Sequence, residues 1–183
     1  MFIRLSPDDM NTKVLAFEFL LCRLLSWKAE LMRVPINQVR LSKTQALKLL
    51  FLASSIRLKD GDDLLDVFDK FYAMQFGPVE SDVYNAITDR SLSFVSFDGE
   101  SQLYVDDRSA EIRNQQLQSR IVESVEQLRI ANPKLVLEQA TSLVCITHKW
   151  RCWKQAYLTA QQLERGSFYM SKKSIRESNS IFE

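Results

Sequence analysis

Apolar residues recur at helical spacing along most of this chain. In the first long segment the inward positions are Val14, Phe17, Leu21, Leu24 and Leu31. Their spacing places them on one face of a helix. Ser6-Pro7-Asp8-Asp9 precedes this stripe with a serine cap, a proline at the first helical position and acidic side chains at the positive end of the helix dipole. The pattern predicts a helix from Pro7 to about Met32, ended by Pro35.

A second helix is predicted after Ser42-Lys43-Thr44-Gln45, which has the spacing of a capping box. Its buried stripe is expected to comprise Leu47, Leu50, Phe51 and Ser54. A turn at Asp60-Gly61-Asp62 separates it from a third predicted helix over Asp63 to Lys70, and the aromatic stretch Phe71 to Phe76 is expected to be a short extended piece.

Gly77-Pro78-Val79-Glu80 predicts another helix start, with Gly77 as the cap and Pro78 at the first helical position. The pattern then changes between Leu92 and Val105. Alternating apolar residues on either side of Asp98-Gly99 predict a small β-hairpin. Further helices are expected over 108–130, from about 134, over 142–163, and from the Ser171 cap through Ile175 to Phe182.

These elements predict a mainly α fold with a minor β component. The chain has 183 residues, which is close to the size of one domain, and only four glycines and four prolines. No repeat or linker-like composition interrupts it. We expect a single compact helical domain over residues 1–183, with about seven or eight helices and one small hairpin.

The cysteines and the apolar runs favour the cytoplasm. Cys22, Cys145 and Cys152 are odd in number and fit no disulfide framework, as is usual for a reducing compartment. The apolar run from Leu15 to Trp27 contains two charged residues and is too short to span a bilayer. No secretory signal is apparent. We therefore expect no membrane association.

Cys145, His148 and Cys152 have metal-like spacing on one helical face. A tetrahedral zinc site needs a fourth ligand, and the chain has no second Cys/His pair to supply it. A small apolar helix face with one hydrogen-bonded histidine is the favoured interpretation. We expect no metal and no cofactor.

The segment Lys149 to Lys154 alternates basic and aromatic residues, as nucleic-acid binders can. Trp150, Trp153 and Tyr157 nevertheless share one helical stripe, for which core packing is the ordinary explanation. Lys149, Arg151 and Lys154 lie off that stripe and are expected to be solvated. The net charge of +1 gives no general reason to expect nucleic acid as a partner.

Charge is unevenly distributed along the chain. One cluster is acidic and comprises Asp60, Asp62, Asp63, Asp66 and Asp69. The carboxy-terminal segment is basic and comprises Lys149, Arg151, Lys154, Arg165, Lys172, Lys173 and Arg176. Each could steer a partner, and each could equally be ordinary solvated surface. A single histidine, no nucleophile elbow and no glycine-rich phosphate loop predict that the chain is not an enzyme.

Two stretches resemble the Panacea domain (DUF4065) of SocA-like antitoxins. They are Leu41 to Phe51, a helix ending in Leu-Leu-Phe, and Tyr72 to Tyr84, which contains Gly-Pro-Val followed by a tyrosine. Many family members have tryptophan where Met74 stands and tyrosine where Phe76 stands. The resemblance extends to the tryptophans near the carboxy terminus. The matching positions, which we expect to be mainly structural, are Leu47, Lys48, Leu50, Phe51, Phe76, Gly77, Pro78, Val79, Tyr84, Trp150 and Trp153.

This resemblance implies an antitoxin that neutralises a cognate protein toxin by direct contact, either as a blocker or as an adaptor to a AAA+ protease. The candidate partner surface comprises Asp62, Asp63, Asp66, Asp69, Phe97, Tyr104, Lys172, Lys173 and Arg176. Two alternatives remain open at this point. One is a DNA-binding regulator of its own operon, and the other is an enzyme of unrecognised type.

Overall fold

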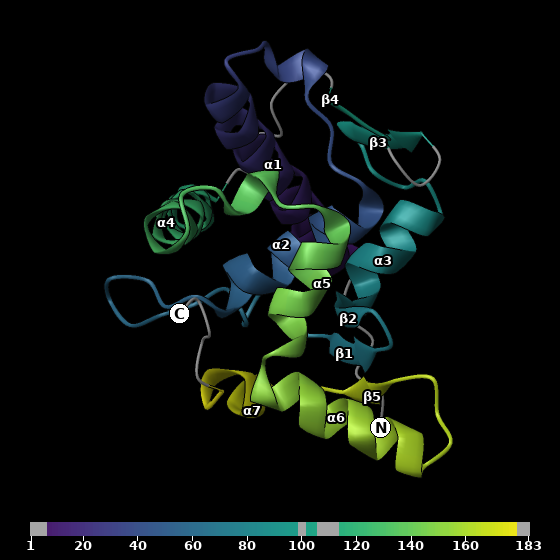
Figure 1. Cartoon of the computed structure of the whole chain (residues 1–183). Helices are drawn as coiled ribbons and strands as arrows, with labels where there is room; N and C mark the ends of the chain where they lie inside the picture. Colours follow the sequence, from purple (N-terminus) through teal and green to yellow (C-terminus); the bar gives the residue numbers. More distant parts are fainter. Residues whose placement is uncertain (1–6, 99–101, 106–113, 179–183) are drawn as a thin grey trace.

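The computed structural model describes residues 7–98, 102–105 and 114–178 (Figure 1). Its helices are α1 (Pro7–Met32), α2 (Lys43–Ser55), α3 (Ser81–Thr88), α4 (Gln115–Ala131), α5 (Ala140–His148), α6 (Arg151–Gln162) and α7 (Lys172–Arg176), with 3₁₀ turns η1 (Ile36–Gln38) and η2 (Leu135–Leu137). Its strands are β1 (Phe71–Met74), β2 (Gly77–Glu80), β3 (Val95–Asp98), β4 (Gln102–Val105) and β5 (Phe168–Tyr169). The predicted mainly α class is confirmed.

Helix α2 forms the centre of the fold. All nine residues from Ala46 to Ser54 are buried, so this helix is surrounded on every side. It contacts α1, α4, α5 and β2, and Figure 1 shows it in the middle of the molecule. The predicted capping box is present: the Gln45 amide donates to the Ser42 hydroxyl, and the Ser42 amide donates to the Gln45 side chain.

Two small antiparallel sheets accompany the helices. The first has the strand order β2-β1-β5, and the second pairs β3 with β4. In the first sheet Tyr72 lies opposite Val79 on one side and Tyr169 on the other. The predicted hairpin around Asp98 is present as β3 and β4, and its turn lies outside the described residues. The three-stranded sheet was not predicted.

The prediction of a helix start at Gly77 and Pro78 is wrong. These residues begin β2, and α3 starts only at Ser81, with Glu80 as its cap. Gly77 has a φ of +96°, which suits the end of the tight β1–β2 turn. Pro78 has no N–H to donate to a neighbouring strand. Proline is tolerated here because β2 is an edge strand, which pairs on one side only.

Two further helix predictions fail. Residues 63–70 form turns instead of a helix, because the Asp63 carboxylate accepts the Leu65 amide and holds the chain in a local turn. The segment expected to start a helix near Lys134 contains only η2, and the helix predicted over 142–163 is divided into α5 and α6. Trp150 interrupts it with an extended backbone (φ −65°, ψ 125°).

The remaining helices are present where they were predicted, but Leu31, expected to face inward on α1, is 36% exposed, and α7 already ends at Arg176. Helix α1 runs from Pro7 to Met32, α4 carries the expected buried residues Ile121, Val125 and Leu128, and Ser171 caps α7. Ser6, residues 108–113 and Phe182 were also assigned to helices, but they lie outside the described residues. Within the described part, no helix combines the length and apolar character that crossing a membrane requires.

Candidate functional site

Strand β2 is completely buried and is held by two buried lysines. Lys48 on α2 is 2% exposed and donates from Nζ to the Pro78 carbonyl at 2.8 Å. At the other end of the strand, Lys13 on α1 is 3% exposed and donates to Glu80 at 2.9 Å. Glu80 also accepts the Val83 amide at 2.8 Å and so caps α3. These contacts fix β2 between α1, α2 and α3.

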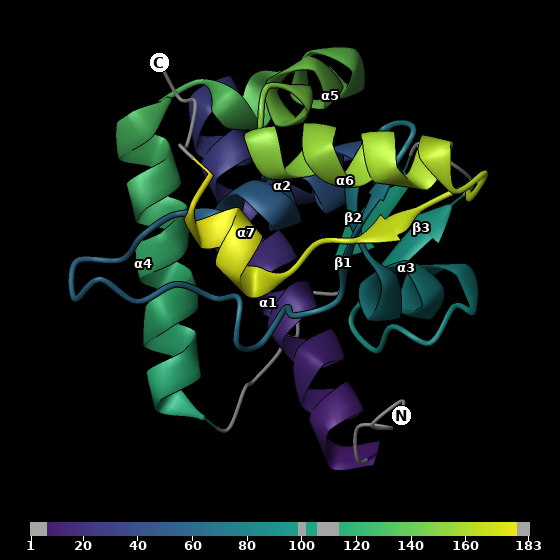
Figure 2. The same ribbon diagram turned by 90° about the horizontal axis from the view of Figure 1, so that it is seen from below.

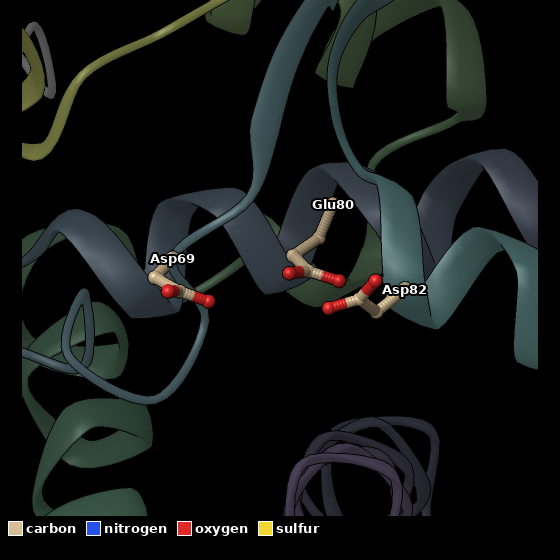
Figure 3. A group of neighbouring side chains, drawn as sticks. All are labelled: Asp69, Glu80 and Asp82. Atoms are coloured by element: carbon tan, nitrogen blue, oxygen red, sulfur yellow. The ribbon is translucent and has the colours of Figure 1, made fainter. Parts of the chain in front are cut away.

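Lys13 lies at the centre of a cluster of carboxylates. Its ammonium group lies 2.7 Å from Asp69, 2.9 Å from Glu80 and 2.8 Å from Asp82. Figure 3 shows the three carboxylates converging, and their oxygens lie within 4.8 Å of one another. Such a group could hold a metal ion, but here the lysine ammonium supplies the balancing positive charge.

The electrostatics of this cluster follow from burial and charge together. Burial alone would lower the pKa of Lys13, but the charge of Glu80 and the hydrogen bonds to all three carboxylates raise it above its ordinary value. Burial likewise acts to raise the pKa of Asp82, but hydrogen bonds from Lys13 and Lys70 hold it below its usual range. The cluster is therefore an internal ion-pair network that joins α1, β2 and α3.

The other buried lysine, Lys48, has a backbone carbonyl as its hydrogen-bond partner. Burial lowers the pKa of Lys48 to about 7. A side chain at Gly77 would place its Cβ 2.7 Å from Thr147 Oγ1 and 3.1 Å from Lys48 Cε, so only glycine fits there. The neighbouring His148 has its pKa lowered by burial and by the charge of Lys48.

A stack of three rings extends from this point along α6. His148 stacks on Trp153 with 3.7 Å between the ring centroids, and Trp153 stacks on Tyr157 at 5.0 Å. Residues 148 and 153 could not stack on one continuous helix, because they would lie on different faces. The break at Trp150 makes this stack possible and also places the Trp150 ring against Phe51, at 5.0 Å.

The turn between β1 and β2, which we call the hairpin tip (Met74, Gln75 and Phe76), faces outward from this buried support. Met74 is 37% exposed and Phe76 is 66% exposed. The Trp153 indole donates to the Met74 carbonyl at 3.1 Å. A large apolar side chain is thus held in solvent on a well-anchored turn.

The positions that carry the family resemblance divide into two groups. Those in the interior are Leu47, Lys48, Leu50, Phe51, Gly77, Pro78, Val79, Trp150 and Trp153. Phe76 and Tyr84 are exposed, and the Tyr84 ring accepts the Lys43 ammonium at 3.7 Å from its centroid. The buried positions pack inside the fold. Among the positions that carry the resemblance, Phe76 and Tyr84 are the two whose side chains a partner can contact.

The predicted acidic surface is largely neutralised within the molecule. Asp63 is 5% exposed and pairs with Arg176 at 2.7 Å, so it is not a surface residue. Asp62 and Asp66 pair with Arg120, and Asp69 pairs with Lys13. The sequence could not reveal these pairings, because each partner is at least 50 residues away.

The other members of the candidate partner surface are scattered. Phe97 is half-buried and packs against the core. Tyr104 lies in β4, but its side chain is outside the described part of the structure. On α7, Lys172 is half-buried, while Lys173 is exposed and lies 3.8 Å from Glu177. Arg176 on the same helix pairs with Asp63, so α7 adjoins the acidic cluster, whereas Phe97 belongs to β3.

The cysteines and the histidine considered as metal ligands are also separated. Cys145 is exposed on α5, whereas Cys152 is buried on α6 beyond the helix break. The group with ligand geometry that the described residues do contain is the carboxylate cluster around Lys13. Sequence reasoning missed Lys13, although a charged residue beside the inward positions Val14 and Phe17 was a usable signal.

Two surface depressions accompany α4. One of about 690 Å³ is lined by Lys13, Asp62, Asp66, Asp69 and Arg120. Another of about 580 Å³ is lined by Phe19, Lys59, Val122, Glu123 and Glu126. The charged residues that line the first depression form ion pairs with each other, Lys13 with Asp69 and Arg120 with Asp62 and Asp66. These charges are therefore balanced within the molecule.

No family model, curated protein or solved structure matches this chain. The features that bear on function are the geometry of the hairpin tip and the resemblance of the two sequence stretches.

Proposed function

We propose that this chain is the antitoxin of a toxin–antitoxin module and that it neutralises a protein toxin by binding it directly through the hairpin tip. The observation that carries the proposal is Phe76, which is 66% exposed on a turn with a buried support. Burying a phenylalanine side chain is worth about 1.5–3 kcal/mol. An exposed aromatic residue of this kind is the usual anchor of a protein interface.

The support beneath the tip favours binding because it limits the entropy that binding would cost. Met74 is fixed through its carbonyl by Trp153, and Pro78 is fixed in the same way by Lys48. Gly77 packs against Thr147 with no room for a side chain. The backbone on both sides of Phe76 is thus restrained before a partner arrives.

The resemblance to Panacea domains supports an antitoxin in particular. The matching residues near Lys48 and Gly77 form the support, and Phe76 stands where many members have another aromatic residue. Direct neutralisation needs only this binding step. Delivery of the toxin to a AAA+ protease would use the same surface and would add a second contact elsewhere on the chain.

The proposal is tested by co-expressing the chain with the small protein encoded beside it. We expect Phe76→Asp to weaken the affinity of the two proteins by about 100-fold, since this corresponds to a loss of roughly 3 kcal/mol. The two proteins should then no longer co-purify, and cells that express both should show the toxicity of the neighbouring protein. Ile130→Asp is the matched control, because Ile130 is 64% exposed on α4. Both views show α4 at the side of the molecule away from β1 and β2 (Figures 1 and 2).

Both variants should unfold at the temperature of the unmodified chain, since both side chains are exposed. A neighbouring protein that remains fully toxic beside the unmodified chain would disprove the antitoxin proposal. A Phe76→Asp variant that still neutralises would show that the hairpin tip is not the binding surface.

A further inference from the structure

Helix α6 presents one exposed face that no other element covers. Arg151, Lys154 and Leu158 follow one another at positions i, i+3 and i+7, and all three are exposed. The opposite face is buried through Cys152, Trp153 and Ala160. Figures 1 and 2 show α6 at the periphery, with its outer side free. We call Lys149, Arg151, Lys154 and Leu158 the α6 face.

The basic residues of the α6 face lie in a stretch of the chain without acidic residues. The sequence contains no acidic residue between Glu138 and Glu164. Within the described ranges, Lys149, Arg151 and Lys154 are exposed and take part in no ion pair. The acidic residues near Asp63, in contrast, are already paired with basic side chains. A local positive field therefore remains on α6 although the chain as a whole is nearly neutral.

Helix α6 lies against the hairpin that carries the tip. It contacts β1, and the Trp153 indole donates to the Met74 carbonyl at 3.1 Å. Arg151 and Lys154 are exposed on the same turns of α6 as Trp153 and therefore border this hairpin. Leu158 adds a second apolar side chain that is 57% exposed. The combined surface has apolar anchors with a positive rim, as protein interfaces often have.

Like charges repel, and opposite charges accelerate docking. The positive α6 face therefore favours a partner with a negatively charged contact surface. We infer that the α6 face and the hairpin tip together bind a protein whose contact surface is acidic around an apolar socket. This inference rests on the proposed function and specifies the kind of toxin that the chain accepts.

A protein fits this surface better than a nucleic acid does. Base stacking requires aromatic rings with free faces. The ring of Trp153 is stacked between His148 and Tyr157, and it is 7% exposed. Phe76 is the one projecting ring among the residues of the two surfaces, whereas Met74 and Leu158 are aliphatic and suit an apolar protein surface. Three basic side chains are also few beside the roughly 6–10 phosphate contacts of a typical DNA-binding protein.

The test compares Arg151→Glu/Lys154→Glu with Arg57→Glu/Lys134→Glu, a pair of exposed basic residues elsewhere that undergoes the same change in charge. The probe is the purified neighbouring protein, and the readout is the association rate at low and at physiological salt. We expect the α6 pair to lower the association rate by about 10- to 100-fold at low salt and to remove its salt dependence. The control pair should change it less than about threefold.

A separate variant, Leu158→Asp, should raise the dissociation rate, since an apolar contact acts after docking. An unchanged association rate for the α6 pair, with tight binding retained, would overturn the inference and leave the proposed function intact. No binding by the unmodified chain would overturn both. A third outcome would also overturn the inference: the unmodified chain binds a 20-base-pair DNA duplex, and the double variant Arg151→Glu/Lys154→Glu loses this binding but still binds the neighbouring protein normally. The α6 face would then be a nucleic-acid surface.

Discussion

Replacing Lys13 with methionine should destabilise the fold strongly. Methionine keeps most of the length and apolar stem of lysine but has no charge. In the variant Glu80, which is 0% exposed, and Asp82, which is 8% exposed, would remain buried without the central ammonium. Breaking a buried ion pair by removing one partner costs about 3–5 kcal/mol, because the remaining charge cannot be solvated. We expect a loss in this range.

Lys70→Met is the matched control. Lys70 contacts Asp82 at 3.0 Å, but its side chain is 32% exposed, so water can replace it. A pair of this kind contributes about 0–1 kcal/mol. Urea unfolding of both variants at neutral pH measures the difference. A loss below about 1 kcal/mol for Lys13→Met would contradict the view that the cluster holds the fold together.

The pH dependence provides a second measurement on the same variant. In the unmodified chain the pKa of Asp82 lies below its ordinary value, so its contribution is present above that value and is lost as the pH falls through the folded-state pKa. Burial already raises the pKa of Glu80, which gives that carboxylate the opposite pH dependence. Without Lys13, burial and mutual repulsion should raise the carboxylate pKa values in the folded state. The variant then binds extra protons when folded and recovers stability as the pH falls.

The two stability curves should therefore converge toward low pH. Calcium should also stabilise Lys13→Met and leave the unmodified chain unchanged, because three carboxylates within 4.8 Å of one another would lack a cation. Parallel pH curves together with no response to calcium would refute the assignment of Lys13 as the balancing charge.

Two further predictions concern the support of β2. Gly77→Ala should lower the free energy of unfolding by about 2–4 kcal/mol, since the φ of Gly77 is +96° and the added Cβ would lie 2.7 Å from Thr147. Gly61→Ala is the control: Gly61 has a φ of +85° but open space around it, so the loss should be only about 1 kcal/mol. Thermal unfolding of both variants measures the difference. Lys48 has a folded-state pKa of about 7 against an ordinary value of 10.5, so the unfolded chain binds the extra proton and stability should rise by about 1.4 kcal/mol per pH unit between these values. Lys48→Met should remove this rise. If the free energy of unfolding of Lys48→Met still increased from about pH 7 to 9.5 as it does in the unmodified chain, the assignment of the rise to Lys48 would be wrong.

Local signals in the sequence were sufficient for several elements. The apolar stripe that begins at Val14 predicted α1, and the capping box at Ser42 predicted α2. Helical periodicity and caps are local signals that depend on residues only a few positions apart. The strands around Asp98 were found for the same reason. Elements of this kind depend little on distant parts of the chain.

The failures occurred where distant partners decide the conformation. Gly77-Pro78-Val79-Glu80 satisfies the local rules for a helix start, but pairing with β1 makes it a strand. The sheet is completed by Phe168 and Tyr169, nearly a hundred residues further along the chain. Helical periodicity also continues through Trp150, so the sequence gives no sign of the break that accompanies the packing of its ring on Phe51.

The candidate site was predictable only in part. The sequence resemblance pointed to Gly77, Pro78 and Phe76, but it could not distinguish a buried support from an exposed tip. The acidic residues near Asp63 looked like surface because their partners, Arg120 and Arg176, come from other elements. A charged residue at an inward helical position, as at Lys13 and Lys48, was the local signal of internal pairing.

The separation between support and tip has a consequence for specificity. The contacts that hold β2 are made by Lys13, Lys48 and Gly77, all inside the molecule, whereas Phe76 contributes little to the core. Changes at the tip or on the α6 face can therefore alter the partner with little effect on stability, because exposed positions away from caps and ion pairs usually change it by less than about 0.5 kcal/mol. A chain built in this way can accommodate a changed partner by surface substitutions alone, while its buried lysines and glycine remain constrained by the fold.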